Sequence, residues 1–326
     1  MKKALTLMIA AALAVCMLTG CGDSNDSGSS TTDGNSVAAS AGADESKPEG
    51  QSAEDQTPEG QSQLNAEELI AGQKVESTGS CGDSATFTYY ENRVAVIEGT
   101  GKITRPGLIL RAKTIIIGEG ITEIDDGCFK SFTSMQEVQL PSTLKKIGSS
   151  AFEKCTTLKS VTLPDGVTEI GNRAFALCKS LTECRLPDTV TVMGDNVFRA
   201  CEILTTANLP SKLTSVPDST FYHCKKLKSI SIPSGVTEIG KNAFEMCSSL
   251  KEIELPAGLK SIGANAFEYD KKITSITIPA SVDTIGTSAF FDWTESQTIT
   301  VEGKSERPAD WAKHWADSDT NVVWNG

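Results

Sequence analysis

The sequence predicts an α/β repeat solenoid, a rod of stacked copies of one short unit with a parallel β-sheet along one face and short helical or 3₁₀ turns. Phenylalanine recurs every 23 residues, eight times without a slip. A proline stands twelve positions after seven of these phenylalanines, and an Ile-Gly pair follows the proline in most of the units. Such short identical units stabilise one another by stacking. The phenylalanines are Phe129, Phe152, Phe175, Phe198, Phe221, Phe244, Phe267 and Phe290.

Each unit contains the signals of one strand and one turn. Apolar and polar residues alternate over residues 160–163, and Pro164 ends the run because proline cannot donate to a β-ladder. Apolar residues in 174–181 have helical or 3₁₀ spacing, and Asn172 is a candidate cap. About six buried apolar side chains contribute about 9 to 18 kcal/mol, whereas ordering one unit costs about 35 kcal/mol. One unit therefore cannot fold alone.

The unit reads Leu-x-x-Val-x-Leu-Pro-x-x-Val-x-x-Ile-Gly-x-x-Ala-Phe-x-x-Cys over residues 158–178 and resembles the BspA-like leucine-rich repeat of bacterial surface proteins. The resemblance covers residues 113–301 and implies a leucine-rich-repeat rod. Residues 81–112 and the tryptophan-containing residues 302–326 resemble segments that flank such arrays, so we expect a β-rich N-terminal cap and a C-terminal cap. Ala207 replaces the branched strand residue and Val216-Pro217 replaces Ile-Gly, which predicts looser packing around Ala207.

The first residues indicate export. Residues 1–20 combine Lys2 and Lys3 with a short apolar run, as a secretory signal peptide does. The run is too short for a membrane-spanning helix. Residues 18–21, Leu-Thr-Gly-Cys, resemble the lipobox of bacterial lipoproteins, which implies that Cys21 is acylated and tethers the chain to the membrane. Simple secretion without a lipid is the alternative.

Residues 21–80 are expected to be a disordered acidic linker. They are rich in Ser, Gly, Pro, Asp, Glu and Gln and poor in aromatic and branched residues, so they cannot bury enough to fold. Twelve acidic residues and two lysines give them −10 of the chain's net −12. With two lysines in the signal peptide, residues 81–326 carry only −4. The acidity of the chain therefore says little about its folded surface or its partner.

No pattern of catalytic residues stands out. His223 and His314 are the only histidines, and neither lies in a metal-binding or triad motif. Cysteines at one position of five units have no Cys-x-x-Cys spacing for zinc, and they are either a reduced buried column or oxidised. We therefore expect the protein to have no catalytic activity and to bind no cofactor or metal. These cysteines are Cys155, Cys178, Cys201, Cys224 and Cys247.

Two exposed surfaces are candidates for binding. Lysines at the turns that enter the strands should align into a basic ridge suited to acidic glycans or protein carboxylates, although ordinary solubilising lysines are the alternative. The ridge consists of Lys179, Lys225, Lys226, Lys228, Lys251, Lys271 and Lys272. Outward strand positions form a polar face with few of the residues that anchor interfaces. Its candidate contacts are Glu137, Gln139, Arg185, Asn208, Glu252 and Glu254.

These features predict a non-enzymatic, extracytoplasmic protein, anchored by lipid to a bacterial membrane at the cell surface. Its expected partner is a protein or an acidic glycan at the cell envelope or on a host surface, and no nucleic acid is expected. The family that the repeats resemble contains adhesins and binders of host matrix, which implies adhesion. A structural spacer without a ligand is the first alternative, and an accessory module for hydrolysis of envelope polymers is the second.

Overall fold

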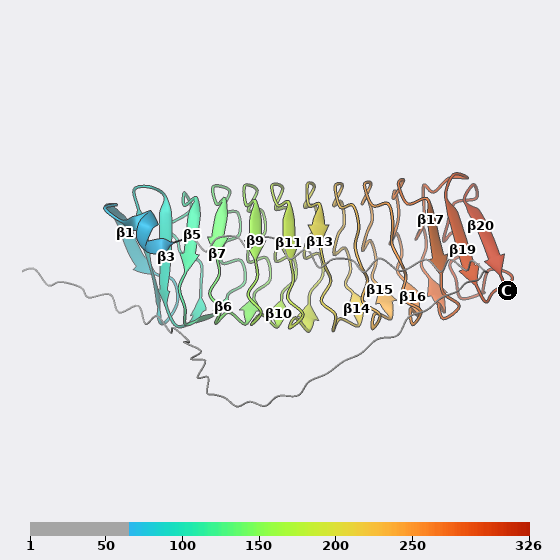
Figure 1. The fold of residues 1–326 in the computed structure, drawn as a ribbon, viewed down its shortest axis with the longest axis horizontal. Coiled ribbons are helices and arrows are strands. Elements are labelled where there is room, and N and C mark those ends of the chain that lie inside the picture. Colours follow the sequence, from blue (N-terminus) through green and yellow to red (C-terminus); the bar gives the residue numbers. More distant parts are fainter. Residues whose placement is uncertain (1–64) are drawn as a thin grey trace, which may run out of the picture. The chain divides into compact units, whose positions relative to one another are not determined.

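The computed structural model describes residues 65–326, which lie within one compact unit, Pro58–Gly326. These residues form a solenoid in which the units stack side by side along one axis (Figure 1). We refer to each stacked unit as a rung and name it by its phenylalanine. Cys21 and the signal peptide lie outside the described residues.

A first parallel ladder contains the strands predicted before five of the seven repeat prolines, whereas before Pro233 and Pro256 there is only an isolated bridge, between Ser229 and Glu252. Each strand residue pairs with the residues at the equivalent positions of the repeats before and after it, so Glu183 pairs with Ser160 and with Thr206. The apolar middle residue of each strand points into the core, so Val161 is buried between two polar neighbours. The strands are β3 (Val94–Gly99), β5 (Thr114–Ile117), β7 (Glu137–Gln139), β9 (Ser160–Thr162), β11 (Glu183–Arg185), β13 (Thr206–Ala207), β17 (Ser275–Ile278), β19 (Thr298–Glu302) and β20 (Asn321–Asn325).

A second parallel ladder, which the sequence reading missed, runs through the Ile-Gly pairs. The glycine is needed for close stacking of these corners: a Cβ on Gly171 would lie 2.5 Å from the backbone nitrogen of Ser149 in the preceding rung. The strands are β4 (Gly101–Ile103), β6 (Ile121–Ile124), β8 (Lys146–Ile147), β10 (Glu169–Ile170), β12 (Val192–Met193), β14 (Ser215–Val216), β15 (Glu238–Ile239), β16 (Ser261–Ile262) and β18 (Thr284–Ile285).

The third side, the turn face, differs from the expected helical turns. Successive backbone amides alternate between a hydrogen bond within the turn and a hydrogen bond to the next rung. Glu153 N donates to Ser150 O at 3.1 Å, whereas Phe152 N donates to Ala174 O at 2.8 Å. Ser150 and Lys154 take left-handed φ values of 56° and 61° to allow this alternation. Half of the amides that a helix would use for its own hydrogen bonds therefore bond to the next rung, and helix is a minor component. Among residues 65–326 the only helix is α1 (Ala66–Ile70).

The core is a stack of phenylalanine rings with a column of thiols beside it. Phe152 and Phe175 stack with ring centroids 5.3 Å apart, and all eight repeat phenylalanines are fully buried. Each repeat cysteine donates from Sγ to the carbonyl of a phenylalanine 26 residues earlier, as Cys178 does to Phe152 at 3.2 Å. The eight cysteines in the described part of the chain are free and buried. The thiols therefore form a reduced column in the core.

The N-terminal end is closed by an antiparallel pair that begins before the expected linker boundary. β1 (Val75–Ser80) pairs with β2 (Ala85–Tyr90), and β2 pairs with β3. The linker was predicted to extend to Ser80, whereas residues 75–80 form β1. The sequence of β1, Val-Glu-Ser-Thr-Gly-Ser, is polar and has no apolar face that would have indicated a strand. At the other end, Trp311 and Trp315 are buried, and Trp315 meets Phe290 edge-on at 5.7 Å.

Candidate binding surfaces

The seven ridge lysines lie exposed where the turn face meets the first ladder, and they fall into three columns. Lys179, Lys225 and Lys271 stand four residues after their phenylalanine; Lys226 and Lys272 stand one residue later. Lys228 and Lys251 stand immediately before the strand position. The structure therefore brings the seven to one edge of the solenoid, although in different columns.

Ion pairs neutralise part of this edge. Glu202 lies between Lys179 and Lys225 in the same column and pairs with each at 3.4 Å. Hydrogen bonds from Lys225 and Lys179 hold the pKa of Glu202 below its usual value. Lys271 pairs with Asp292 of the next rung. Three of the seven lysines are therefore compensated, and the continuous ridge is interrupted.

Four ridge lysines take part in no ion pair among residues 65–326. We name Lys226, Lys228, Lys251 and Lys272 the basic cluster; they lie on the consecutive Phe221, Phe244 and Phe267 rungs. Adjacent strands lie about 4.8 Å apart, so the cluster spans about 10 Å along the axis. This spacing places several positive charges within one Debye length at physiological salt.

The predicted strand-face contacts divide into free and occupied side chains. Glu137 and Arg185 are exposed on strands of the first ladder, and Glu252 and Glu254 are exposed on the same side of the solenoid, where only Glu252 forms a bridge. Asn208 is instead occupied by the backbone: its amide accepts from Leu186 N and donates to Leu186 O, both at 2.8 Å. Gln139 is partly buried. This face is acidic near the basic cluster, where Glu252 and Glu254 follow Lys251.

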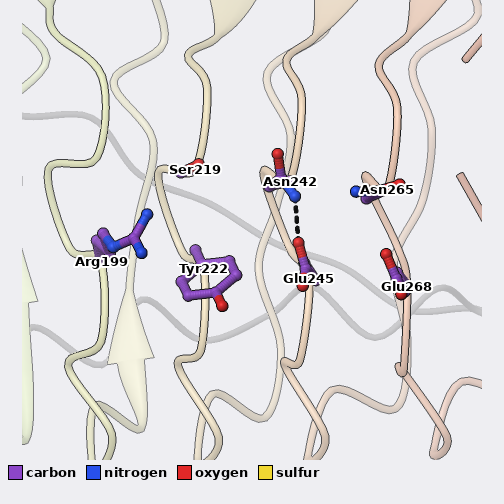
Figure 2. A pocket seen from close by; sticks show the side chains of 7 residues that line it. All are labelled: Arg199, Ser219, Tyr222, Asn242, Glu245, Asn265 and Glu268. Atoms are coloured by element: carbon purple, nitrogen blue, oxygen red, sulfur yellow. Dashed lines mark hydrogen bonds between the residues drawn. The ribbon is translucent and has the colours of Figure 1, made fainter.

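A polar groove of about 390 Å³ lies on the turn face, at the residues shown in Figure 2. Arg199 covers the ring of Tyr222, with 4.4 Å between its guanidinium carbon and the ring centroid. Glu245 is nearly buried and accepts a hydrogen bond from Asn242. Burial, together with the negative charges of Glu245 and Asp292, raises the pKa of Glu268 to about 7.

Sequence reasoning missed the Glu245 and Glu268 pair because the two residues are 23 positions apart. Both directly follow a repeat phenylalanine, so reading down that column of the repeat would have found them. Stacking then turns a separation of 23 residues into neighbouring positions on adjacent rungs. Both carboxylates lie in an open, polar groove, which differs from the enclosed pair that acid and base catalysis needs.

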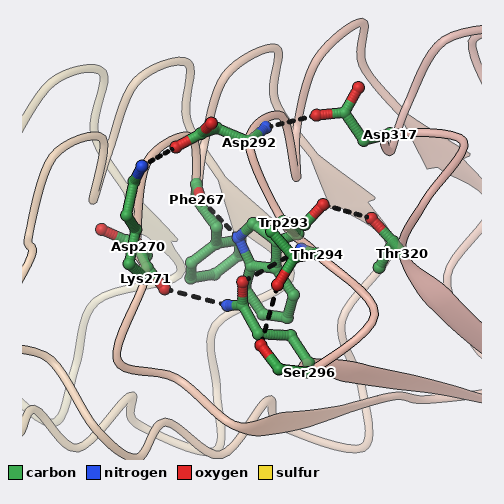
Figure 3. Close-up of polar contacts among 10 residues, drawn as sticks. Phe267, Asp270, Lys271, Asp292, Trp293, Thr294, Ser296, Asp317 and Thr320 are labelled. Atoms are coloured by element: carbon green, nitrogen blue, oxygen red, sulfur yellow. Dashed lines mark hydrogen bonds and ion pairs between the residues drawn. The ribbon is translucent and has the colours of Figure 1, made fainter.

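A network of hydrogen bonds supports the turn face near the C-terminal end (Figure 3). Trp293 Nε1 donates to Phe267 O at 2.9 Å, and Thr320 Oγ1 donates to Trp293 O at 3.1 Å. Gln297 Nε2 donates to Asp270 O at 3.2 Å. The side chain of Asp270 is fully buried, and both its oxygens lack a hydrogen-bond partner in the described part of the chain.

Residues 65–326 contain neither a cluster of metal ligands nor a membrane-spanning helix. No group of three His, Cys, Asp or Glu side chains there could hold a metal ion. No helix there has the length and apolar character needed to cross a bilayer. Burial raises the pKa of the repeat thiols, as for Cys155 and Cys201, to about 12 each, so these thiols are poor nucleophiles.

The family model for the BspA type leucine rich repeat region matches residues 110–228 and 214–308, with six copies. A solved leucine-rich repeat protein from Bacteroides ovatus is 24% identical, with a TM-score of 0.59, over 74% of this chain and 66% of that protein. This similarity concerns the fold, and the chain spans just under two thirds of the Bacteroides protein.

Two further solved structures share the repeat type. A leucine rich cell surface protein from Faecalibacterium prausnitzii is 25% identical over 73% of this chain and 78% of that one, with a TM-score of 0.41. The leucine rich repeat protein of T. pallidum is 21% identical over 54% of this chain and 88% of that one, with a TM-score of 0.46. No curated protein matches the chain.

Proposed function

Because the chain belongs to the BspA-type leucine-rich-repeat family, we propose that it is a bacterial cell-surface protein that binds another protein or an acidic glycan without catalysis. The observation that carries this proposal is the basic cluster. Its four exposed lysines have no acidic partner within residues 65–326 and occupy three consecutive rungs. The description of the Faecalibacterium protein as a cell surface protein agrees with this location.

The shape of the site favours an extended, acidic ligand. A stacked core fixes the rungs relative to one another, so the lysines are held at a regular spacing without cost in backbone ordering. Glu252 and Glu254 on the neighbouring strand face repel anions, and a ligand therefore approaches the cluster from the turn side. A chain of carboxylates or sulfates satisfies this pattern.

Binding to heparin and to polygalacturonate tests the cluster with sulfate and carboxylate probes. The variant Lys226→Glu, Lys228→Glu, Lys251→Glu and Lys272→Glu should lose binding that wild type shows at low salt. A matched control changes four exposed lysines elsewhere on the solenoid to Glu and alters net charge equally. The control positions are Lys145, Lys154, Lys212 and Lys241.

The outcomes separate the candidate functions. Retention of both polysaccharides by the control and loss by the cluster variant support the proposal. Equal binding by both variants refutes a role for the cluster. If wild type captures neither polysaccharide, and cross-linking on living cells captures no protein at the cluster, the structural spacer is the better account.

The proposed location includes a lipid anchor at Cys21. The support is the resemblance of residues 18–21 to a lipobox, since two or more acyl chains hold a protein stably on a bilayer. Cells that express the chain should incorporate labelled palmitate into it and keep it in the membrane fraction. Cys21→Ser should abolish both. Membrane retention of an unlabelled Cys21→Ser variant would refute the anchor while leaving the binding proposal intact.

A further inference from the structure

The junction between the Phe198 and Phe221 rungs is discontinuous on both strand faces. In the second ladder, β12 is the edge of one sheet and β14 is the edge of the next. In the first ladder, β13 is likewise the edge of its sheet. The first ladder is also interrupted between β7 and β9, but there the second ladder continues from β8 to β10. Among residues 65–326, both ladders stop together only at this junction.

Pro217 explains the gap in the second ladder. At this position other rungs have a glycine whose N–H donates to the rung before, as Gly240 does to Val216 O at 2.8 Å. Proline has no N–H, so the corresponding bond to Met193 O cannot form. At the equivalent position of the preceding rung the space is too small for a side chain, since a Cβ on Gly194 would lie 2.6 Å from Asn172 N. Pro217 therefore interrupts the second ladder, and the two corners are joined there by a side-chain bond, from Asp218 N to Asp195 Oδ1 at 3.2 Å.

Ala207 lies in β13, the strand at the edge of the gap in the first ladder. The equivalent residues in the neighbouring rungs are Cys184 and Ile230, both buried, whereas Ala207 is only partly buried. Its small side chain offers the next rung less to pack against, and β13 contains only two residues. The looser packing expected around Ala207 thus coincides with the position of Pro217.

The turn face, in contrast, is continuous across the same junction. Phe198 N donates to Thr220 O at 2.9 Å and Ala200 N donates to Tyr222 O at 2.7 Å. Phe198 and Phe221 stack with their centroids 5.6 Å apart. The Arg199 and Tyr222 contact described above joins the two rungs at the surface. Backbone, core and surface contacts therefore all persist on one of the three sides.

We propose that this junction is a hinge, at which the solenoid bends about the turn face while the two strand faces open and close. A side with intact backbone bonds resists separation, and sides without them give way first, so the direction of bending follows from the bonding. The ion pair of Glu202 with Lys225 crosses the junction at its edge. Bending therefore changes the distance between Lys179 and the basic cluster.

Distances between paired spin labels on the full chain test the hinge. Glu183→Cys with Glu252→Cys places labels on exposed first-ladder residues three rungs apart, across the junction. Glu137→Cys with Thr206→Cys spans three rungs on the same face without crossing it. The native thiols in this region are buried and free, so the label goes to the introduced ones. The crossing pair should give a distance distribution at least twice as wide as the control pair.

Equal widths for the two pairs would overturn the hinge without any further variant. Pro217→Gly, which restores the donor and removes the ring, should narrow the crossing distribution toward the control. If a folded Pro217→Gly protein keeps the wide distribution, the assignment of the hinge to Pro217 is wrong. Hydrogen exchange gives a second readout, in which the amide of Thr214 exchanges at least tenfold faster in wild type than the equivalent amide of Thr237, which donates to Thr214 O at 2.9 Å.

Discussion

Trp293 donates from Nε1 to the carbonyl oxygen of Phe267 at 2.9 Å, in the position where the preceding rungs use a cysteine thiol. Cys247 makes the equivalent bond to Phe221 at 3.2 Å. A thiol and an indole differ greatly in size and chemistry, yet each supplies one buried donor to one buried carbonyl. The column is therefore defined by hydrogen-bond donation, and by this criterion Asp270 is its exception.

Asp270 occupies the column between Cys247 and Trp293, and its carboxyl group makes no hydrogen bond to Phe244 O. Burial raises the pKa of Asp270 well above its usual range, and both its oxygens lack a partner in the described part of the chain. Asp270→Cys restores a donor at the position facing Phe244 O. We expect stabilisation of about 1 to 3 kcal/mol, the usual cost of an unsatisfied buried polar group. Urea unfolding measures it, with Asp270→Ala as the control that removes the carboxyl group without supplying a donor.

An Asp270→Cys protein no more stable than Asp270→Ala would show that the donor is unimportant. A protein less stable than wild type would show that protonated Asp270 already makes the bond well. Both results come from the same titration, because each variant is compared with wild type and with the other.

Much of the solenoid was predictable because its signals are local and repeated. The spacing of 23 and the proline after each strand are visible without any structure, and the phenylalanine stack follows from them. The second ladder was missed because a strand of two residues, such as Glu169–Ile170, is too short to show alternation. The left-handed residues Leu177 and His223 were missed as well, since no local propensity favours that conformation and stacking imposes it.

The candidate surfaces were predictable only in part. Exposure of the ridge lysines follows from their type, but the neutralising position of Glu202 depends on which columns align between rungs. Asn208 was placed on the open face by alternation, whereas its amide is occupied by Leu186. Side chains that bond to the backbone of another rung carry no signal in a single unit.

Glu268 should make stability depend on pH. Its folded pKa of about 7 lies above the usual value, mainly through burial and then through Glu245 and Asp292. The folded state therefore binds more protons than the unfolded state, and stability falls as pH rises from about 4.5 through 7. Glu268→Gln should flatten this decline, so that its advantage over wild type is greater at pH 8 than at pH 5. Thermal unfolding at both pH values measures it, and an advantage independent of pH would contradict the assignment.

The corner glycines should tolerate no side chain. A Cβ on Gly171 would lie 2.5 Å from Ser149 N and 2.7 Å from Gly148 C, so Gly171→Ala must push two backbones apart. We expect destabilisation of about 1 to 3 kcal/mol, as for other overpacked sites. Gly258→Ala is the matched control, because a Cβ there would meet nothing within 4 Å. A comparable loss of stability in the two variants would mean that the close approach of the backbones at the corner does not affect stability.

A column of Asx side chains at the corners suggests a stabilising change. Asp195 Oδ1 accepts from Asp218 N at 3.2 Å, and Asp218 Oδ1 accepts from Lys241 N at 2.7 Å, so each side chain ties its corner to the next rung. The column ends at Lys241, because a lysine side chain has no acceptor.

Lys241→Asn should continue the column by supplying an acceptor for Ala264 N. A hydrogen bond of this kind contributes about 0.5 to 1.5 kcal/mol, and we expect Lys241→Asn to stabilise the protein by that amount. Lys241→Ala removes the same charge without an acceptor and serves as the control. Asp218→Ala should lose a similar amount, since Lys241 N would then lack its partner. Urea unfolding of the three variants decides, and equal stabilities of Lys241→Asn and Lys241→Ala would show that the corner amide is satisfied by solvent.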